Sequence, residues 1–348
     1  MNDNKNQKRT TIKEVAKKAG VSVATVSRVM NNQDIVKEEK KQKVLQAISD
    51  LNFVPNPAAR TLGKKQVFKV AVIVPNIMNY ALADTVKGIS QTLHNRQVDM
   101  MLFNSGEDPE KEKKAFLSLS DKLVEGVIFI AQCGHQIDFS QMAKRMPIVL
   151  IERAEKTNLV DRLEIDNDDA MRKIVGHLYE LGHRKIAYIS GEATSYNTQN
   201  ITKSFIKALK KYDLPEMKNC YINTSYTFSG GKKGLEKLLD RKEEFTAIVC
   251  SSNVIAIGVV NTAIKLGYKI PEDFSISGYD SFPEIEVLTP AITTIDYPAY
   301  GLGVMAAEAI LEKFDSEGTI APKQKVIKVE LVKGESTGPI GKKKTKKQ

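Results

Sequence analysis

The sequence predicts a small all-α unit at its amino end, followed by an α/β body of two doubly wound lobes. Short amphipathic helix patterns, separated by a glycine turn, fill roughly the first fifty residues. From Phe68 onward, continuous apolar runs alternate with helical patterns, as in parallel sheets covered on both faces. The chain has 348 residues, and the body of roughly 270 exceeds one domain of ordinary size, which predicts two lobes.

Positive charge is concentrated at the two ends of the chain. The net charge is +10, yet residues 1–66 alone hold 14 Lys+Arg and 6 Asp+Glu, a net of +8. The lysine run at 342–347 adds +5, which leaves −3 on the rest. This asymmetry favours a polyanion-binding module attached to a body with another task.

Composition and terminal sequence limit the class of protein. No apolar run approaches the ~18 residues of a membrane span, and the polar amino end does not resemble a signal peptide, so we expect a cytoplasmic protein. Cys133, Cys220 and Cys250 are widely spaced, which predicts reduced and mostly buried thiols.

The first predicted helix begins at a capping box, because Thr11 is followed three residues later by Glu14. Apolar residues then recur at helical spacing until Gly20 ends the helix. A second helix follows a cap at Ser22. Its apolar side is predicted to hold Val23, Val26, Val29 and Met30.

A third helix is predicted from roughly Glu38 to Leu51 and closes a small core. Its apolar face is predicted to hold Val44, Leu45, Ile48 and Leu51. Two short helices joined by a glycine turn form a helix-turn-helix unit, whose second helix enters the DNA major groove.

The residues early in the second helix suit base and phosphate contacts. Arg28 carries the forked donors that match guanine O6 and N7. Val23 and Ala24 can lie against thymine methyl groups, and Thr25 and Ser27 can bond phosphates.

Residues 56–66 are predicted to hold a short hinge helix. Asn56 can cap it, Pro57 is favoured at its first position and Gly63 ends it. A helix this short needs a packing partner, such as its twin in a dimer over DNA. Leu62 would then suit a wedge between base steps in the minor groove.

The body is predicted to contain seven buried strands separated by helices. The strands are Lys69–Val74, Asp99–Phe103, Gly126–Ile130, Ile148–Ile151, Lys185–Ser190, Ala247–Cys250 and Ser275–Gly278. The helices include Ala83–Leu93, Asp169–Leu181, Ile201–Tyr212 and Val254–Leu266. In such folds, ligands bind at the carboxyl ends of the strands, which predicts a cleft between the lobes.

Two segments match enzyme motifs, but the sequence around each of them does not fit the corresponding enzyme fold. Residues 334–338 match G-x-S-x-G, but no histidine follows His183 to complete a triad. Gly301 to Ala306 fit a loose G-x-G-x-x-A after Pro298 without a preceding strand, so we expect a helix start there. The four histidines lack metal-ligand spacing. We therefore predict no catalytic residue, no metal and no cofactor.

Residues 11–32 and 53–62 resemble the lactose-repressor-type (LacI/GalR) family of bacterial transcription regulators. The first segment reads TIKEVAKKAGVSVATVSRVMNN, and the second, FVPNPAARTL, resembles that family's hinge helix. The resemblance implies DNA contacts from Thr11, Ser22, Val23, Ala24, Thr25, Ser27, Arg28, Asn31, Asn56, Ala59, Arg60 and Leu62. Lys37 departs from the usual Ser or Thr cap, at a cost of about 1 kcal/mol.

The resemblance continues through the body, in segments that include 181–191, 278–280 and 334–337. It implies a helix-turn-helix domain at 1–55, a hinge at 56–66 and a periplasmic-binding-protein-like core at 67–338. Lobe one would be about 67–165 plus 293–325, and lobe two about 166–292 plus 326–338. The last strand is expected at 334–337, and a basic disordered tail at 339–348.

The resemblance also implies effector contacts in the cleft, at Asn76, Asn79, Tyr80, Tyr226, Phe228, Ser252 and Asp280. Asp280 would accept a ligand hydroxyl or ring donor, and Tyr226 and Phe228 would pack on an apolar ligand face. Ile201 stands where many members carry a ligand-gripping Arg. We therefore expect an effector other than a simple sugar: a less polar molecule, a protein, or none.

These observations together predict a dimeric transcription regulator, most simply a repressor, that binds a near-palindromic DNA operator and is modulated by an effector. The alternative is a solute-binding receptor with a basic amino-terminal segment. If the lysine tail contributes phosphate attraction, deletion of residues 342–348 should weaken binding to all DNA alike.

Overall fold

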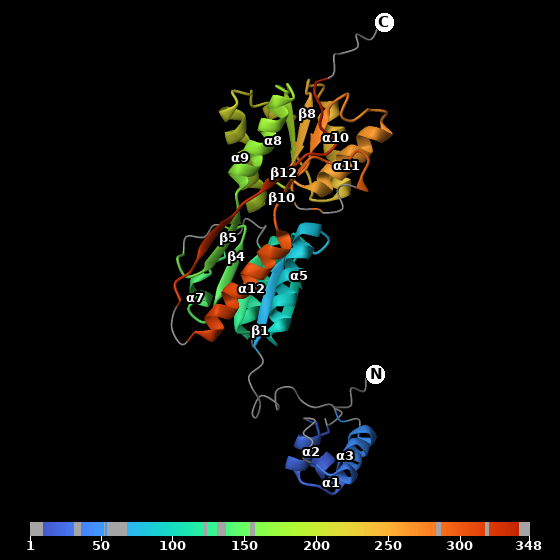
Figure 1. The fold of residues 1–348 in the computed structure, drawn as a ribbon, viewed down its shortest axis with the longest axis vertical. Helices are drawn as coiled ribbons and strands as arrows, with labels where there is room; N and C mark the ends of the chain where they lie inside the picture. The colour runs from blue at the N-terminus through green and yellow to red at the C-terminus, as the bar shows by residue number, and fades with distance from the viewer. Residues whose placement is uncertain are drawn as a thin grey trace, which may run out of the picture. The chain divides into compact units, whose positions relative to one another are not determined.

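A computed structural model gives the fold of this chain. It describes residues 10–30, 36–51, 53, 68–121, 124–130, 137–153, 157–280, 282, 287–316 and 320–340. The chain divides into one unit up to Val67 and a second from Phe68 (Figure 1). The predicted hinge, residues 341–348 of the predicted tail, and the expected contacts Asn31, Asn56, Ala59, Arg60 and Leu62 lie outside the described residues. Residue Ile340, at the start of the predicted tail, is described, and its N–H donates to the Leu181 carbonyl at 3.2 Å.

Three helices form the amino-terminal unit: α1 (Ile12–Ala19), α2 (Val23–Met30) and α3 (Glu38–Asp50). The predicted capping box is present, with the Thr11 N–H donating to Glu14 Oε2 at 2.6 Å and the Glu14 N–H to Thr11 Oγ1 at 3.4 Å. Gly20 ends α1 in the left-handed region at φ +64°, which favours glycine. Ser22 Oγ accepts the Thr25 N–H at 3.2 Å and caps α2.

A small core joins the three helices, and it differs from the predicted one at two positions. Val26 and Val44 are fully buried, as expected, whereas Val23 is 41% exposed and Leu45 is 44% exposed. Each step of three residues drifts about 60° around a helix, so Val23 lies about 120° from Val29 and leaves the buried stripe. Leu45 lies about 100° from Val44 and points away from it.

The amino end of α3 lacks a side-chain cap. Lys37 occupies the N-cap position and makes no capping hydrogen bond, as the sequence predicts. The carboxyl end of α3 is better anchored, because Lys18 Nζ of α1 lies 2.9 Å from Asp50 Oδ2.

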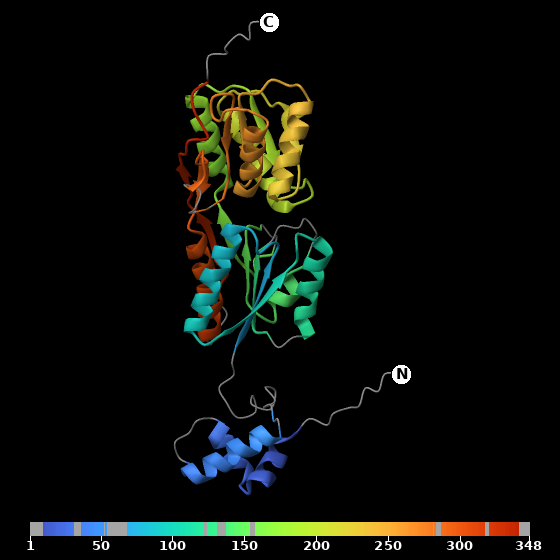
Figure 2. The same cartoon turned by 90° about the vertical axis from the view of Figure 1, so that its right-hand side faces the viewer.

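Lobe one is built on a parallel six-stranded sheet with the order β11-β5-β4-β3-β1-β2. Helices α5 (Tyr80–Asn95) and α12 (Ala299–Asp315) cover one face, while α6 (Pro109–Leu117) and α7 (Ser140–Ala143) cover the other (Figures 1 and 2). The strands are β1 (Lys69–Val74), β2 (Asp99–Asn104), β3 (Gly126–Ile130), β4 (Ile148–Ile151), β5 (Asp161–Ile165) and β11 (Gln324–Ile327).

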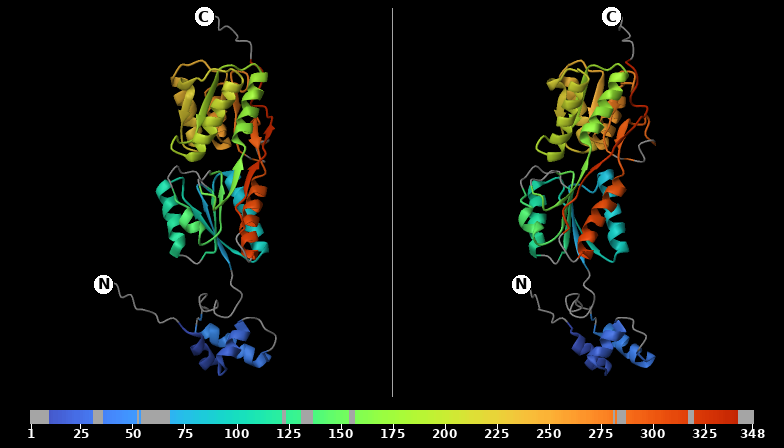
Figure 3. Two further views of the ribbon diagram at one scale, coloured as in Figure 1. Left: turned by 90° about the vertical axis from the view of Figure 1, so that its left-hand side faces the viewer. Right: turned by 60° about the vertical axis from the view of Figure 1, so that its left-hand side comes forward.

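Lobe two is built on a parallel four-stranded sheet with the order β7-β6-β8-β9. Helices α8 (Asn167–Glu180) and α9 (Tyr196–Lys211) pack on one face, and α10 (Phe228–Asp240) and α11 (Asn253–Lys265) on the other (Figure 3). The strands are β6 (Ile186–Ser190), β7 (Tyr221–Asn223), β8 (Ala247–Cys250) and β9 (Ser275–Ser277).

The chain crosses between the lobes after β5, before α12 and after β11. Two of these crossings pair as antiparallel strands β10 (Thr294–Asp296) and β12 (Glu330–Val332). This two-stranded strap lies between the lobes in Figure 1. The sheet of lobe one includes β11 and is covered by α12, and Ser336 hydrogen-bonds to β9 of lobe two, so both lobes use residues beyond 290.

Most predicted strand positions are confirmed within one residue, but the expected last strand is wrong. Residues 334–337 form a turn, and the final strands are β11 and β12 instead. Ser336 joins this turn to β9, because its Oγ donates to the Ile276 carbonyl at 2.6 Å and its own carbonyl accepts the Ile276 N–H at 2.8 Å. Gly301 lies in α12, which confirms a helix rather than a nucleotide-binding loop there.

Within the described residues, none of the helices is long and apolar enough to cross a membrane. Cys220 and Cys250 are buried, as predicted, and Cys133 lies outside the described residues.

Candidate functional site

One side of α2 is anchored in the core and the other is open to solvent. Val26 and Val29 are buried, whereas Ser22, Val23, Ala24 and Arg28 are exposed. Thr25 and Ser27 are partly buried at the edges of this face. The sequence-predicted contacts of α2 therefore lie together on one outward surface that presents a hydroxyl, two small apolar groups and a guanidinium.

Thr11, also an expected contact, is exposed immediately before α1, but its hydroxyl already takes part in hydrogen bonds of the helix cap. Its Oγ1 lies 3.1 Å from Glu14 Oε2 and accepts the Glu14 N–H. Its backbone N–H is bound by the same carboxylate, so Thr11 fixes the start of the helix.

The second candidate site lies where the carboxyl ends of the two sheets approach each other. The strand order reverses between β1 and β3 in lobe one and between β6 and β8 in lobe two. Such switch points open a crevice in doubly wound sheets. Contacts between the lobes mark this position: the rings of Tyr80 and Phe282 meet edge to face, with centroids 5.1 Å apart.

Asp280 is the residue at which the lobes converge. Its carboxyl group accepts hydrogen bonds from Tyr297 Oη, at 3.3 Å, and from the Asn79 side chain of lobe one. Burial raises the pKa of this carboxyl well above its usual range, and the nearby Glu152 charge raises it further. Asp280 therefore holds its proton more readily than an exposed aspartate.

The backbone of Asp280 is strained and clamped. Its φ of +94° is rare for a residue with a side chain. Asn253 Nδ2 donates to the Asp280 carbonyl at 2.5 Å, and Thr294 Oγ1 lies 3.2 Å from the same oxygen. Gly278 leaves the room for this clamp, since a Cβ there would lie 2.0 Å from Asn253 Oδ1. Asn253 was not among the predicted site residues.

Asn76 and Asn79 shape the loop after β1. Asn76 Nδ2 donates to Glu107 Oε1 at 3.0 Å, while its Oδ1 accepts the Met78 N–H at 2.9 Å. Asn79 Oδ1 accepts the Leu82 N–H at 3.2 Å and so caps α5. Asn79 thus joins a helix start in lobe one to the carboxyl group of Asp280 in lobe two.

The two predicted aromatic contacts differ in exposure. Tyr226 is 8% exposed, and its hydroxyl lies 2.9 Å from Thr198 Oγ1. Its ring fills the space beside Gly191, where a Cβ would come within 2.0 Å of it. Burial raises the pKa of Tyr226 to about 12. Phe228, at the start of α10, is 44% exposed and presents its ring to solvent.

Two predicted positions in lobe two contribute structure beneath the site. Ser252 is fully buried, and its Oγ accepts the Ile255 N–H at 3.4 Å as the cap of α11. Ile201, where a ligand-gripping arginine is expected from the resemblance, is buried in α9.

Glu152, like Asn253, is a site residue that sequence reasoning missed. It directly follows β4 with φ +54°, another strained position for a residue with a side chain. Burial raises the pKa of its carboxyl to about 7. Its charge acts on Asp280, Tyr226, Tyr279 and Tyr297. The sequence could have pointed to Glu152 through its position, because it directly follows a predicted central strand, where ligands bind in such folds.

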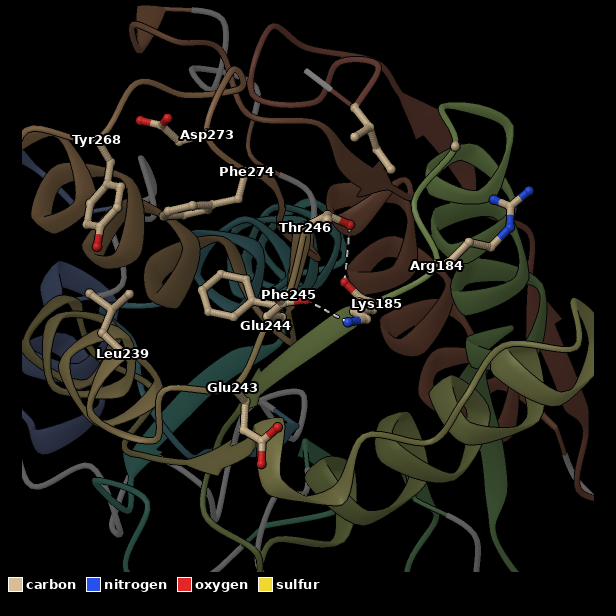
Figure 4. A pocket seen from close by; sticks show the side chains of 12 residues that line it. Arg184, Lys185, Leu239, Glu243, Glu244, Phe245, Thr246, Tyr268, Asp273 and Phe274 are labelled. Atoms are coloured by element: carbon tan, nitrogen blue, oxygen red, sulfur yellow. Dashed lines mark hydrogen bonds and ion pairs between the residues drawn. The ribbon is translucent and has the colours of Figure 1, made fainter. Parts of the chain in front are cut away.

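A separate cavity of about 540 Å³ opens at the other edge of the lobe-two sheet (Figure 4). It is lined by Phe245, Tyr268 and Phe274, and an ion pair of 2.8 Å joins Lys185 to Glu244 at its wall. This cavity lies at the strand amino ends, so it is distinct from the switch-point crevice. Within the described residues, none of the His, Cys, Asp and Glu groupings could hold a metal ion.

Comparisons with known proteins match both parts of this architecture. Residues 11–56 match the family described as bacterial regulatory proteins, lacI family, and residues 175–337 match a periplasmic binding protein-like domain. Catabolite control protein A of Priestia megaterium is 32% identical over 312 residues, which cover 89% of this chain and 94% of that protein.

Solved structures show the same fold. The lac repressor dimer bound to operator and the anti-inducer ONPF has a TM-score of 0.75 at 23% identity, covering 95% of this chain and all of that one. The complex of the transcriptional regulator CelR with cellobiose has a TM-score of 0.70 at 25% identity, covering 94% of this chain and all of that one.

Proposed function

Because this chain belongs to the lacI family of bacterial regulatory proteins, we propose that α2 reads an operator and that the crevice between the lobes receives an effector. The chain is a DNA-binding transcription regulator and not an enzyme. The main support for an operator-reading role is that α2 has one buried side and one exposed side. Val26 and Val29 hold the helix in its unit while Val23, Ala24 and Arg28 stay free to reach base edges.

The operator is proposed to be a near-palindrome bound by a dimer. A two-fold protein places two copies of α2 in successive major grooves, so the two half-sites repeat in inverted order. One structural neighbour is the lac repressor dimer bound to operator. Within this arrangement, Asn56, Ala59, Arg60 and Leu62 of the hinge would contact the minor groove, as Asn31 would contact the backbone.

The effector is proposed to bind among Asn76, Asn79, Tyr80, Tyr226, Phe228 and Asp280, with Ser252 supporting them from the start of α11. Asp280 already contacts both lobes through Asn79 and Tyr297. A ligand that replaces these contacts would change how the lobes sit against each other and thereby shift DNA affinity. We place this activity, most simply repression, in the cytoplasm, where the DNA is.

Selection of binding sites from random DNA with the full-length protein tests the proposal. The expected result is an enriched near-palindrome bound with a steep salt dependence, because phosphate contacts release counterions. A scrambled version of the enriched site is the control and should bind only at the non-specific level. Recovery of unenriched sequence, with equal affinity for the scrambled site, would contradict an operator-reading role.

A further inference from the structure

We propose that residues 341–348 bind the cavity at the strand amino ends of lobe two, within the same chain. This segment reads GKKKTKKQ and lies outside the described residues. The cavity has a volume of about 540 Å³, within the range of about 300–1,000 Å³ that is typical of ligand sites. Binding there is independent of the operator and effector roles proposed above.

Aromatic side chains give the cavity an apolar floor (Figure 4). The ring of Phe274 contacts two others, with centroids 5.4 Å from Phe245 and 5.3 Å from Tyr268. Phe274 is buried, whereas Phe245 and Tyr268 are partly exposed and leave apolar surface open to a ligand. Such rings attract ammonium groups over their faces and pack against the methylene stem of a lysine side chain.

Carboxylates line the same cavity: Glu243, Glu244 and Asp273 are all exposed there. Among the described residues, Glu243 and Asp273 form no ion pair. Glu243 Oε1 accepts a hydrogen bond from Asn219 Nδ2 at 3.0 Å, and Asp273 Oδ2 accepts the Lys269 N–H at 2.7 Å. Each carboxylate can accept further hydrogen bonds, because its two oxygens offer about four lone-pair sites.

The two cations among the described residues that line the cavity are engaged elsewhere. Lys185 Nζ lies 2.8 Å from Glu244 Oε2, as the dashed line in Figure 4 marks. The Arg184 guanidinium lies 3.8 Å from the centre of the Tyr179 ring and donates to the Tyr179 carbonyl at 2.9 Å. Figure 4 shows Arg184 directed away from the aromatic floor. The remaining negative charge therefore favours a cationic occupant.

The segment 341–348 starts at the wall of this cavity. Ile340 lines the cavity, and its N–H donates to the Leu181 carbonyl at 3.2 Å, which holds the chain where the segment begins. Five of the eight residues that follow are lysines. Eight extended residues span about 26 Å, which is ample for a cavity of about 540 Å³. Because the segment is tethered there, its local concentration is in the millimolar range, so weak contacts suffice.

A bound segment would place lysine ammonium groups beside Glu243 and Asp273 and lysine stems on the open rings. Exposed ion pairs are individually weak and are screened by salt, so we expect several lysines to share the contact. The same lysines would then be withheld from DNA phosphates.

A dye-labelled peptide of residues 341–348 tests this assignment when it is added in trans and followed by fluorescence anisotropy. A chain shortened to end at Ile340 keeps every described residue and should bind the peptide saturably, with affinity that falls as salt is raised. The full-length chain should bind it at least tenfold more weakly, because its own segment competes. The control peptide carries glutamine at its five lysine positions and should bind neither chain.

Variants of the shortened chain identify the residues responsible. Glu243→Gln combined with Asp273→Asn removes both charges but keeps the shape of the side chains, and it should weaken peptide binding at least tenfold. Glu236→Gln, on α10 outside the lining of the cavity, is the matched control and should keep binding. Melting temperatures establish that each variant is folded. No peptide binding, equal affinity for the shortened and full-length chains, or full binding by the double variant would overturn the proposal.

DNA is the competing destination of the lysines, and its binding is measured on the same pair of chains. If the segment binds the cavity, its removal leaves the salt dependence of binding to random DNA unchanged. A flatter salt dependence in the shortened chain would assign the lysines to phosphates and would overturn the proposal, while the operator-reading role of α2 would stand.

Discussion

The exposed face of α2 and the crevice between the lobes are the two surfaces proposed for recognition, and they hold their polar groups in opposite ways. On α2 the groups stand in water over a satisfied core, with the caps at Thr11 and Ser22 already bonded. In the crevice, Glu152 and Asp280 are partly buried, strained at positive φ and close enough for the Glu152 charge to raise the pKa of Asp280. The polar groups of the first surface therefore need no rearrangement, whereas the two residues of the second hold backbone conformations that are unfavourable for residues with side chains.

The largest expected effect comes from breaking the small core under α2. Val26→Asp places a charge at a fully buried position, which should cost more than about 4 kcal/mol and unfold the amino-terminal unit. DNA binding should vanish while the melting of the body, followed by calorimetry, stays unchanged. Val23→Asp, three residues earlier on the exposed side, is the control that should fold. Joint loss of both units would show that they do not fold independently.

The next largest effect is a dependence of the body's stability on pH, caused by Glu152 in the crevice. The pKa of Glu152 is raised to about 7 from an ordinary 4.5, so its proton stabilises the folded state at acidic pH. That stability is complete below about pH 4.5 and is lost as pH rises through 7, by on the order of 2–3 kcal/mol. Facing it are Asp280, whose raised pKa acts in the same direction, and the tyrosines Tyr226, Tyr279 and Tyr297, which stay neutral in this range.

Denaturant unfolding of the body between pH 4.5 and 8 measures this loss. Glu152→Gln should flatten the curve because its amide does not titrate, and Glu244→Gln should leave it unchanged. If Glu152→Gln showed the same pH dependence as the wild type, the raised pKa of Glu152 would be contradicted.

Arg28→Ala is expected to cost about 1–3 kcal/mol of binding to the selected operator and to relax the preference at one base pair. Electrophoretic shifts on operator and random DNA provide the comparison. If Arg28 contacts a base, the loss falls on the operator; an equal loss on both would assign it to the phosphates.

The smallest expected effect concerns the start of α3, which lacks the side-chain cap that α1 and α2 have. Lys37 leaves the start of α3 without a side-chain acceptor, so Lys37→Ser should stabilise the amino-terminal unit by about 1 kcal/mol. Thermal melting followed by helical circular dichroism can detect the change. Lys43→Ser, inside the helix, should not stabilise the unit.

The fold class and most element positions could be predicted from the sequence. The strands β1, β3 and β8 are continuous apolar runs, and polar residues mark clearly where each run ends. The prediction failed for β5 and β11, whose partly exposed faces break the apolar run. It also failed for the turn at 334–337, which meets β9 through the side chain and the backbone of Ser336 without forming a strand. Glu152 could not be found by pattern alone, since its pKa depends on groups that only the tertiary structure brings together. The clamp of Asn253 on Asp280 is likewise a contact between distant segments.

The three crossings between the lobes also set an order of events during synthesis. The helices α1 to α3 are complete once residue 50 has left the ribosome, whereas the sheet of lobe one waits for β11 and lobe two for the turn at Ser336. A message cut short before residue 290 would therefore yield a finished α1–α3 unit on an unfinished, apolar body. Such fragments should be removed by proteases rather than accumulate, which would keep half-made regulators from occupying DNA.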